Sequence, residues 1–168
     1  MPYFIIIRGP LGSGKTTLST KLAKHLNAEH IRIDKTLDKL KLNKIDEKEG
    51  CIPAKNFIKA IESVLPKAKQ LLGDGKTVIF DACFYHKEVI DHLTQNIPFP
   101  HYVFTLKAPV EICIKRDSER KKTYGEGAAR AVHMLVSRFD HGNMIDVTGS
   151  VEETLSDILS YLPIPENS

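Results

Sequence analysis

A glycine-rich segment near the N-terminus carries the residues whose types and spacing point most directly to chemistry. Residues 9–16 read GPLGSGKT and fit the pattern G-x-x-x-x-G-K-S/T at every position. Glycine has no Cβ, so such a loop can wrap phosphates with its N–H groups, and the following helix adds partial positive charge. Lys15 is expected to bridge the β- and γ-phosphates of a nucleotide, and the Thr16 hydroxyl is expected to ligate Mg²⁺. The expected nucleotide contacts are Gly9, Leu11, Gly12, Ser13, Gly14, Lys15, Thr16 and Thr17.

A basic segment over residues 115–130 precedes the last predicted strand. It holds six basic and three acidic residues, a local net charge of +3. Arg116 and Arg120 are four residues apart, so a helix over 110–120 would place both on one face, within reach of a γ-phosphate. The alternative is a solvated face paired with neighbouring acids. We expect residues 116–130 to form a short lid, with Arg116 also contacting the nucleotide. Arg130 and Arg138 are weaker candidates, and Lys121 and Lys122 are expected to steer charge.

The segments that must position these residues alternate between strand and helix. Short continuous apolar runs are typical of parallel strands buried on both faces, and the alternation predicts right-handed crossovers in a doubly wound α/β fold. Asp34 and Asp81 are expected to end the second and third strands. Strands are expected at 3–8, 30–34, 77–81, 101–106 and 143–147. Helices are expected at 16–26, within 35–49, from 53 to about 73 with a kink at Pro66, and at 86–94, 110–120, 128–138 and 151–162.

Length and composition bound the class of protein. The chain has 168 residues, 42% of them hydrophobic and 27% charged, which predicts a single domain over residues 1–168. A net charge of +3 is too mild to indicate nucleic acid or a membrane as partner, and no apolar run approaches the roughly 20 residues of a membrane span. The three cysteines form no C-x-x-C pair and the seven histidines show no ligand spacing, so we expect structural or surface roles for them. The apolar N-terminal stretch is too short for a signal sequence, and a cytoplasmic location is expected.

Three classes of phosphate-loop protein compete for this sequence. The strings NKID at 43–46 and DVTG at 146–149 match GTPase motifs, but their order is the reverse of that in GTPases, so we interpret them as coincidences. A remodelling ATPase usually has an acidic pair after an apolar strand, whereas Asp81 is followed by Ala82. A small kinase has an acid after the second strand, a single aspartate after the third and a basic lid before the fifth. All three occur here in that order.

At these positions the chain resembles the small P-loop kinases of the adenylate-kinase type, nearest the branch of adenylylsulfate kinase, polynucleotide 5′-hydroxyl kinase and shikimate kinase. LKAPVEIC at 106–113, leading to Arg116, is similar to adenylylsulfate kinase, and IFDA at 79–82 resembles a strand end of polynucleotide kinase. The resemblance implies a three-layer α/β fold: a five-stranded parallel sheet of order 2-3-1-4-5, helices on both faces and a short lid. The D-G-D and F-T-G-I-D stretches of adenylylsulfate kinases are absent, which leaves the acceptor open.

The same resemblance implies roles for several residues. Asp34 would be the general base that accepts the proton of an acceptor hydroxyl, and Asp81 would hold a Mg²⁺-bound water. Each could instead cap a helix or turn. Residues 148–151 resemble the loop that packs against adenine, or they form an ordinary turn in which Ser150 caps the next helix. Phe84 and Tyr85 follow the third strand, where acceptors bind in these folds, or they are buried aromatics.

The sequence therefore predicts a kinase that transfers the γ-phosphoryl group of Mg-ATP to a hydroxyl of a small-molecule acceptor, as adenylylsulfate kinase does. Alternatives are a polynucleotide 5′-hydroxyl or nucleoside/nucleotide kinase, and a non-catalytic ATP-binding module. ATP and Mg²⁺ are the expected cofactors. A nucleic-acid end is a less favoured partner, no membrane is expected, and the protein would be a monomer or homodimer. The expected catalytic residues are Lys15, Asp34, Arg116 and Arg120, and the expected metal ligands are Thr16 and Asp81.

Overall fold

Five short strands form one parallel sheet at the centre of the computed structural model, which describes residues 1–165. The strand order is β2-β3-β1-β4-β5, and every pairing is parallel. The strands are β1 (Phe4–Arg8), β2 (Glu29–Arg32), β3 (Val78–Ala82), β4 (His101–Lys107) and β5 (Asn143–Asp146). The expected α/β fold and strand order are confirmed. All carboxyl ends therefore meet at one edge of the sheet, where ligands bind in open α/β folds.

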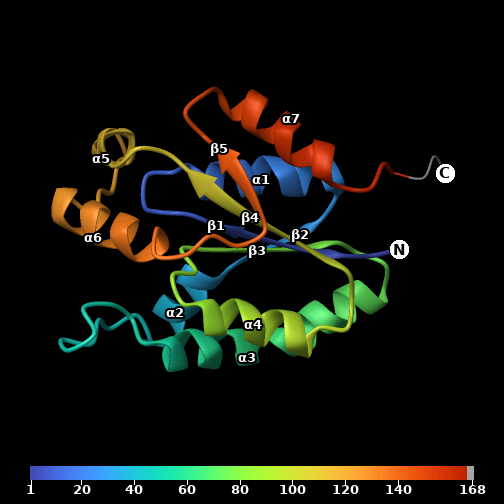
Figure 1. Ribbon diagram of the computed structural model, residues 1–168. Helices are drawn as coiled ribbons and strands as arrows, with labels where there is room; N and C mark the ends of the chain where they lie inside the picture. The colour runs from blue at the N-terminus through green and yellow to red at the C-terminus, as the bar shows by residue number, and fades with distance from the viewer. Residues whose placement is uncertain (166–168) are drawn as a thin grey trace.

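Helices cover both faces of this sheet and one edge (Figure 1). Helices α1 and α7 lie on one face, and α2, α3 and α4 lie on the other, while α5 and α6 stand beyond the carboxyl ends of β1 and β4. The helices are α1 (Lys15–Leu26), α2 (Ile33–Lys39), α3 (Ala54–Gly73), α4 (Lys87–Asn96), α5 (Val110–Ser118), α6 (Glu126–Val136) and α7 (Val151–Tyr161). None of the helices within residues 1–165 has the length and apolar character needed to cross a membrane.

Alternation along β1 divides the core into two layers. Phe4 and Ile6 belong to the apolar cluster under α3 and α4, whereas Ile5 and Ile7 belong to the cluster under α1 and α7. All four are fully buried, because a central parallel strand is covered on both faces. The sheet edge that carries the phosphate loop is thus held by packing on both sides.

Two predicted boundaries near the site are wrong. The second strand ends at Arg32 rather than Asp34, because Arg32 is still extended (φ −92°, ψ 102°) as the N-cap of α2 and Ile33, whose side chain is fully buried, already begins that helix. The helix expected over 110–120 ends at Ser118, so Arg120 lies beyond it. The remaining strands and long helices agree with expectation to within a few residues, and Pro66 lies inside α3.

Candidate functional site

The phosphate loop connects β1 to α1 in a conformation that depends on glycine. Gly12 and Gly14 have φ of +78° and +81°, which a side chain would strain. A Cβ on Gly12 would also lie 2.0 Å from the Cys113 carbonyl oxygen, whereas one on Gly14 would meet nothing within 4 Å. The Ser13 hydroxyl donates to the Pro10 carbonyl at 2.7 Å and closes the turn. The N–H groups at the start of α1 therefore open onto the edge of the sheet.

Lys15 lies inside the loop, and 7% of its surface is exposed. Burial alone would lower the pKa of its ammonium, but Cys83, Asp34 and Asp81 outweigh burial and raise it above its ordinary value. The side chain is therefore a fixed positive charge at neutral pH. It stands where two aspartates predicted from sequence converge, one from α2 and one from β3.

Two adjoining hollows surround the loop on its outer side. The first, about 280 Å³, is lined by Gly12, Gly14, Lys15, Thr16, Thr17, Arg116 and Arg120. The second, also about 280 Å³, is lined by Ser13, Gly14, Thr17, Leu18, Arg116, Val147, Gly149, Ser150, Val151 and Thr154. Arg116 lines both hollows. We call the first one the phosphate hollow, because the residues predicted from sequence to bind phosphates line it. The Ser150 hydroxyl accepts from the Glu153 N–H at 3.1 Å, so this residue caps α7 and lines the second hollow as well.

Asp81 lies within β3 with 2% of its surface exposed, so its interpretation as a cap or turn residue is wrong. Its Oδ2 is 2.9 Å from Nε2 of His30, which comes from the neighbouring strand β2. Its Oδ1 is buried and has no hydrogen-bond partner among the described residues. A buried carboxylate oxygen without a partner is costly unless something binds it. The donor set, this oxygen with the Thr16 hydroxyl, fits Mg²⁺, which keeps several waters and takes one or two protein oxygens.

Asp34 is the second residue of α2 rather than a strand-end residue, and Arg32 is the N-cap. The alternative role of Asp34 as a helix cap is therefore wrong. Burial raises the pKa of its carboxyl, Lys15 acts against this rise, and Asp81 adds to it. Asp34 is thus more basic than an ordinary aspartate. Asp34 lines a separate cavity from the hollow that Lys15 lines.

We call this space the acceptor cavity. It has a volume of about 250 Å³ and lies between α2, the loop before α3 and the helix α6. Tyr85 lines it, and its hydroxyl accepts from the Ile52 N–H at 3.0 Å. Phe84 does not line it: its side chain is buried, and its carbonyl accepts from Arg8 Nε at 3.2 Å. The lining residues are Leu11, Asp34, Leu37, Asp38, Asn43, Ile45, Gly50, Cys51, Ile52, Phe57, Cys83, Tyr85, Tyr124, Ala128, Ala131, Val132 and Leu135.

The two lid arginines reach the phosphate hollow from different elements. Arg116 is in the last turn of α5, and Arg120 follows the helix, with its guanidinium 5.7 Å from the centre of the Tyr124 ring. The prediction that they share a helix face is wrong, yet both line the same hollow. No ion pair holds either of them within residues 1–165. The alternative, a basic face paired with neighbouring acids, is therefore not seen among the described residues.

Asp117 anchors the segment between α5 and α6, a role that the sequence did not reveal. It is 1% exposed, and its carboxylate accepts from the N–H groups of Tyr124 and Gly125 at 3.1 Å each. Arg130 is bound to Glu126 at 2.9 Å, away from the loop, and Arg138 is exposed. The segment between α5 and α6 is thus held at its base, and of the arginines at 116, 120, 130 and 138 only Arg116 and Arg120 line the phosphate hollow.

Arg8 is a second residue that the sequence analysis missed. It ends β1 and is fully buried, donating to the carbonyls of Phe84, Val136 and Phe139 and to Thr105 Oγ1 at 2.9–3.2 Å. Burial lowers the pKa of its guanidinium to about 10, against the raising effect of Asp140 and Cys83. The sequence signal that could have revealed Arg8 is its position as a charged residue at the end of an otherwise apolar strand. Arg8 holds the end of α6 and the chain after β3 to the sheet.

The GTPase-like strings both form local turns. The Asn43 amide donates to Asp38 at 2.8 Å, and the Asp46 carboxylate accepts from the N–H groups of Lys48 and Glu49. The Asp146 carboxylate likewise accepts from the N–H and hydroxyl of Thr148 at 2.8 and 2.6 Å. These hydrogen bonds explain the residue types without a guanine base.

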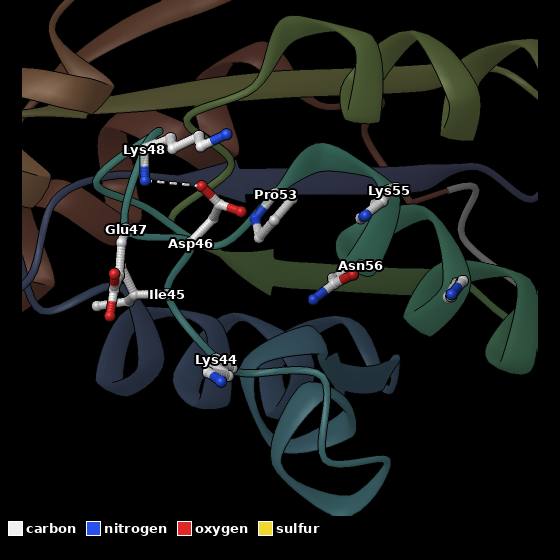
Figure 2. A pocket seen from close by; sticks show the side chains of 9 residues that line it. Lys44, Ile45, Asp46, Glu47, Lys48, Pro53, Lys55 and Asn56 are labelled. Atoms are coloured by element: carbon white, nitrogen blue, oxygen red, sulfur yellow. Dashed lines mark hydrogen bonds between the residues drawn. The ribbon is translucent and has the colours of Figure 1, made fainter.

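A lysine-rich hollow of about 610 Å³ lies beside the acceptor cavity, between the loop 44–48 and the start of α3 (Figure 2). Ile45 lines both spaces. The lysines of this hollow are Lys44, Lys48, Lys55 and Lys59, and none of them is in an ion pair within the described part of the chain. We refer to this space as the lysine hollow.

Glu49, Cys51 and His86 also approach one another within 4.8 Å near the acceptor cavity. The His86 Nε2, however, is 2.7 Å from the Ile52 carbonyl oxygen, to which it must donate a proton. The thiol of Cys51 is held protonated as well, because burial and Glu49 raise its pKa. This arrangement therefore serves as a contact between the loop and the start of α4.

Comparison with known proteins places this geometry among P-loop folds. A family model described as an AAA domain matches residues 4–140. A gluconokinase from Sinorhizobium meliloti 1021 superposes with a TM-score of 0.67 at 14% identity, covering 95% of this chain and 90% of that chain. A sugar kinase from Janibacter sp. HTCC2649 gives a TM-score of 0.77 at 16% identity, with coverages of 96% and 94%. The shikimate kinase of Aquifex aeolicus VF5 gives 0.61 at 17%, with 94% and 94%.

These likenesses establish the fold. A comparison with curated proteins finds no significant match.

Proposed function

Because the chain belongs to this AAA-domain family of P-loop proteins, we propose that it is an ATP-dependent kinase acting on a hydroxyl of a small-molecule acceptor. The gluconokinase, sugar kinase and shikimate kinase folds that it resembles support this class. In this proposal the hollows beside Thr17 take ATP and the acceptor cavity takes the second substrate.

The observation that carries the proposal is the position of Asp34. Asp34 lines the acceptor cavity, and Lys15 lines the phosphate hollow. The two are close enough for the charge of Lys15 to offset part of the rise in the Asp34 pKa. A hydroxyl in that cavity would therefore meet a base on one side and the terminal phosphate on the other. Neither a GTPase nor a binding module requires a second cavity that is lined by a carboxylate of raised pKa.

The transfer step follows from this arrangement. The acceptor oxygen forms a bond to the γ-phosphorus as the bond from that phosphorus to the bridging oxygen breaks, and ADP leaves with the electron pair. Asp34 accepts the hydroxyl proton, and its raised pKa makes it better suited to do so near neutral pH. Lys15 holds the β- and γ-phosphates in line, and Arg116 and Arg120 neutralise charge that spreads over the γ-oxygens.

Thr16 and Asp81 are the residues that would hold Mg²⁺, since the Asp81 Oδ1 has no other partner among the described residues. When bound, the ion would neutralise charge on the β- and γ-phosphate oxygens. The chain's own contribution is orientation: the hydrogen bond from His30 fixes the Asp81 carboxylate with Oδ1 left unpaired.

Transfer of label from γ-labelled ATP to pooled acceptors tests the proposal. The pools are adenylylsulfate, nucleosides, neutral sugars, sugar acids with shikimate, and oligonucleotides with a 5′-hydroxyl. Labelled product with the wild-type chain and none with Lys15→Met would support a kinase. ATP binding with no labelled product in any pool would instead favour a non-catalytic binding module.

One observation favours a second candidate, a kinase of oligonucleotide 5′-hydroxyls. The lysine hollow meets the acceptor cavity at Ile45 and could bind a phosphate backbone whose terminal hydroxyl enters the cavity (Figure 2). Lys55→Gln together with Lys59→Gln would then lower oligonucleotide phosphorylation and flatten its salt dependence. The same pair of changes would leave transfer to a nucleoside unaltered.

A further inference from the structure

The acceptor cavity has an unusual charge for a pocket beside a phosphate site. Of its 17 lining residues, none is lysine, arginine or histidine, counted over residues 1–165. The charged groups in the lining are two carboxylates, Asp34 and Asp38, which stand four residues apart on α2. This spacing places both on one face of the helix.

The basic residues of the neighbourhood lie elsewhere. Arg116 and Arg120 line the phosphate hollow, and Arg130 is bound to Glu126. Helix α6 already forms a wall of the cavity through Ala128, Ala131, Val132 and Leu135, so it stands over the cavity without contributing an arginine. The lysines beside Ile45 open into the separate hollow of Figure 2. No basic side chain of the described residues lines the cavity, and two positive charges act from outside the lining: Lys15 on Asp34 and Cys83, and Arg138 on Cys51.

The remaining lining is mostly apolar and aromatic. Phe57 and Tyr85 pack edge to face with ring centres 5.4 Å apart, and aliphatic side chains from α2 and α6 complete the wall. A volume of about 250 Å³ accommodates a compact molecule. Asn43 also lines the cavity, and its amide donates to Asp38 at 2.8 Å.

We propose that this cavity selects an uncharged or cationic alcohol with an apolar body, and that Asp38 favours an amine on that body. The inference rests on the proposed function, in which the hydroxyl lies at Asp34. A carboxylate or phosphate on the same body would be repelled by Asp38 and by Asp34, whose charge Lys15 offsets in part. The cavity thus ranks sugar acids, shikimate and adenylylsulfate below neutral and amine-bearing hydroxyl compounds.

A matched set of three probes tests this selection on the full chain with Mg-ADP. Each probe has a benzene ring with one hydroxymethyl group, and the para substituents are an aminomethyl, a carboxamide and a carboxylate. Binding is followed by NMR, with signals of Tyr85, Ala131 and Val132 reporting the cavity and those of Lys55 and Lys59 reporting the lysine hollow. We expect the amine and the amide to bind in the cavity at least about tenfold more tightly than the carboxylate.

A substitution isolates the contribution of Asp38. Asp38→Asn keeps the shape of the side chain but removes its charge. We expect it to weaken binding of the aminomethyl probe by about two- to fivefold, as for the loss of an exposed ion pair, and to leave binding of the carboxamide probe unchanged. Asp74→Asn, at the exposed end of α3 and outside the cavity, is the matched control and should alter neither. If Asp38→Asn weakened binding of the amine and amide probes equally, Asp38 would act through its shape rather than its charge. That result would overturn the proposal that Asp38 favours an amine.

The outcomes separate the two proposals. Cavity binding of the carboxylate as tight as that of the amide, or binding of none of the three probes, would overturn the charge selection. Cavity binding in the expected order, with no labelled product from these probes or from any pooled acceptor, would reject the kinase function and leave the charge preference standing. Transfer to acids in preference to neutral alcohols would reject the selection and keep the kinase.

Discussion

His30 and Asp81 lie on adjacent strands, and the 2.9 Å hydrogen bond between them occupies only one oxygen of the Asp81 carboxylate. The other oxygen is buried without a partner among the described residues. The pair therefore resembles a metal ligand and the neighbour that orients it, a relationship that commonly governs affinity at such sites.

Removing the imidazole of His30 should weaken the binding of Mg²⁺. His30→Ala is expected to raise the Mg²⁺ concentration that gives half-maximal activity by about tenfold, because the carboxylate loses its fixed orientation. Asp81→Asn should have a larger effect. Lys67→Ala, which removes an exposed ion pair with Glu29 on the same strand as His30, is the control and should change little. A Mg²⁺ titration that is the same for His30→Ala and the wild type would count against this role.

The phosphate loop offers a matched pair of glycines. Gly12→Ala would place a Cβ against the Cys113 carbonyl at positive φ, whereas Gly14→Ala has similar φ and open space. We expect Gly12→Ala to lower the free energy of unfolding by at least about 2 kcal/mol more than Gly14→Ala and to abolish ATP binding. Denaturant unfolding and calorimetric titration with ATP measure both. If both variants lost the same free energy of unfolding, backbone strain alone would account for the loss, and the contact with the Cys113 carbonyl would play no part.

The lid arginines should act on transfer more than on binding. Arg116→Ala and Arg120→Ala are each expected to lower kcat by about a hundredfold with a smaller change in ATP affinity, because charge on the γ-oxygens changes during transfer. Arg130→Ala is the control, since that residue pairs with Glu126 outside the hollow. Unaltered kcat in both of the first two variants would remove these arginines from the mechanism.

Asp34 links activity to stability through its raised pKa. The Asp34 carboxyl binds its proton more tightly in the folded protein than in the unfolded chain. Its contribution to the free energy of unfolding is therefore fully present below the pKa of the unfolded state, and it is lost as the pH rises through the pKa of the folded state. Ionised Asp34 therefore costs stability at neutral pH, and Asp34→Asn should melt at a higher temperature than wild type at pH 7 but not at pH 3. The acid limb of kcat/KM should fall at a pH above the ordinary aspartate value of about 3.9. A melting temperature that drops at pH 7 would contradict this account.

The fold was predictable where the physics is local or repeats along the chain. The buried run ending at Arg8 and the glycines after it fixed the strand, loop and helix that hold Lys15. Asp34 was placed correctly near the loop but on the wrong element, because β2 passes directly into α2 at Arg32 with neither glycine nor proline to mark the boundary. Arg120 was placed on a helix face because a spacing of four suits a helix, but the helix ends two residues earlier.

The residues that sequence reasoning missed depend on contacts between distant segments. Arg8 bonds to groups 76 to 131 residues away, and His30 meets Asp81 across 51 residues. Such partners become neighbours only once the strand order is known. The charge of the acceptor cavity is of the same kind, since its wall combines α2 with α6 and the loop between α2 and α3.

Single-turnover transfer by Asp34→Asn tests the central claim most directly. The variant keeps the shape of the side chain and removes the base, so ATP affinity measured by calorimetry should stay within a few-fold of wild type. Transfer to whichever acceptor the pooled assay identifies should fall by about 10²- to 10⁴-fold. A variant that binds ATP and transfers at the wild-type rate would contradict the assignment of Asp34 as the base between the two substrates.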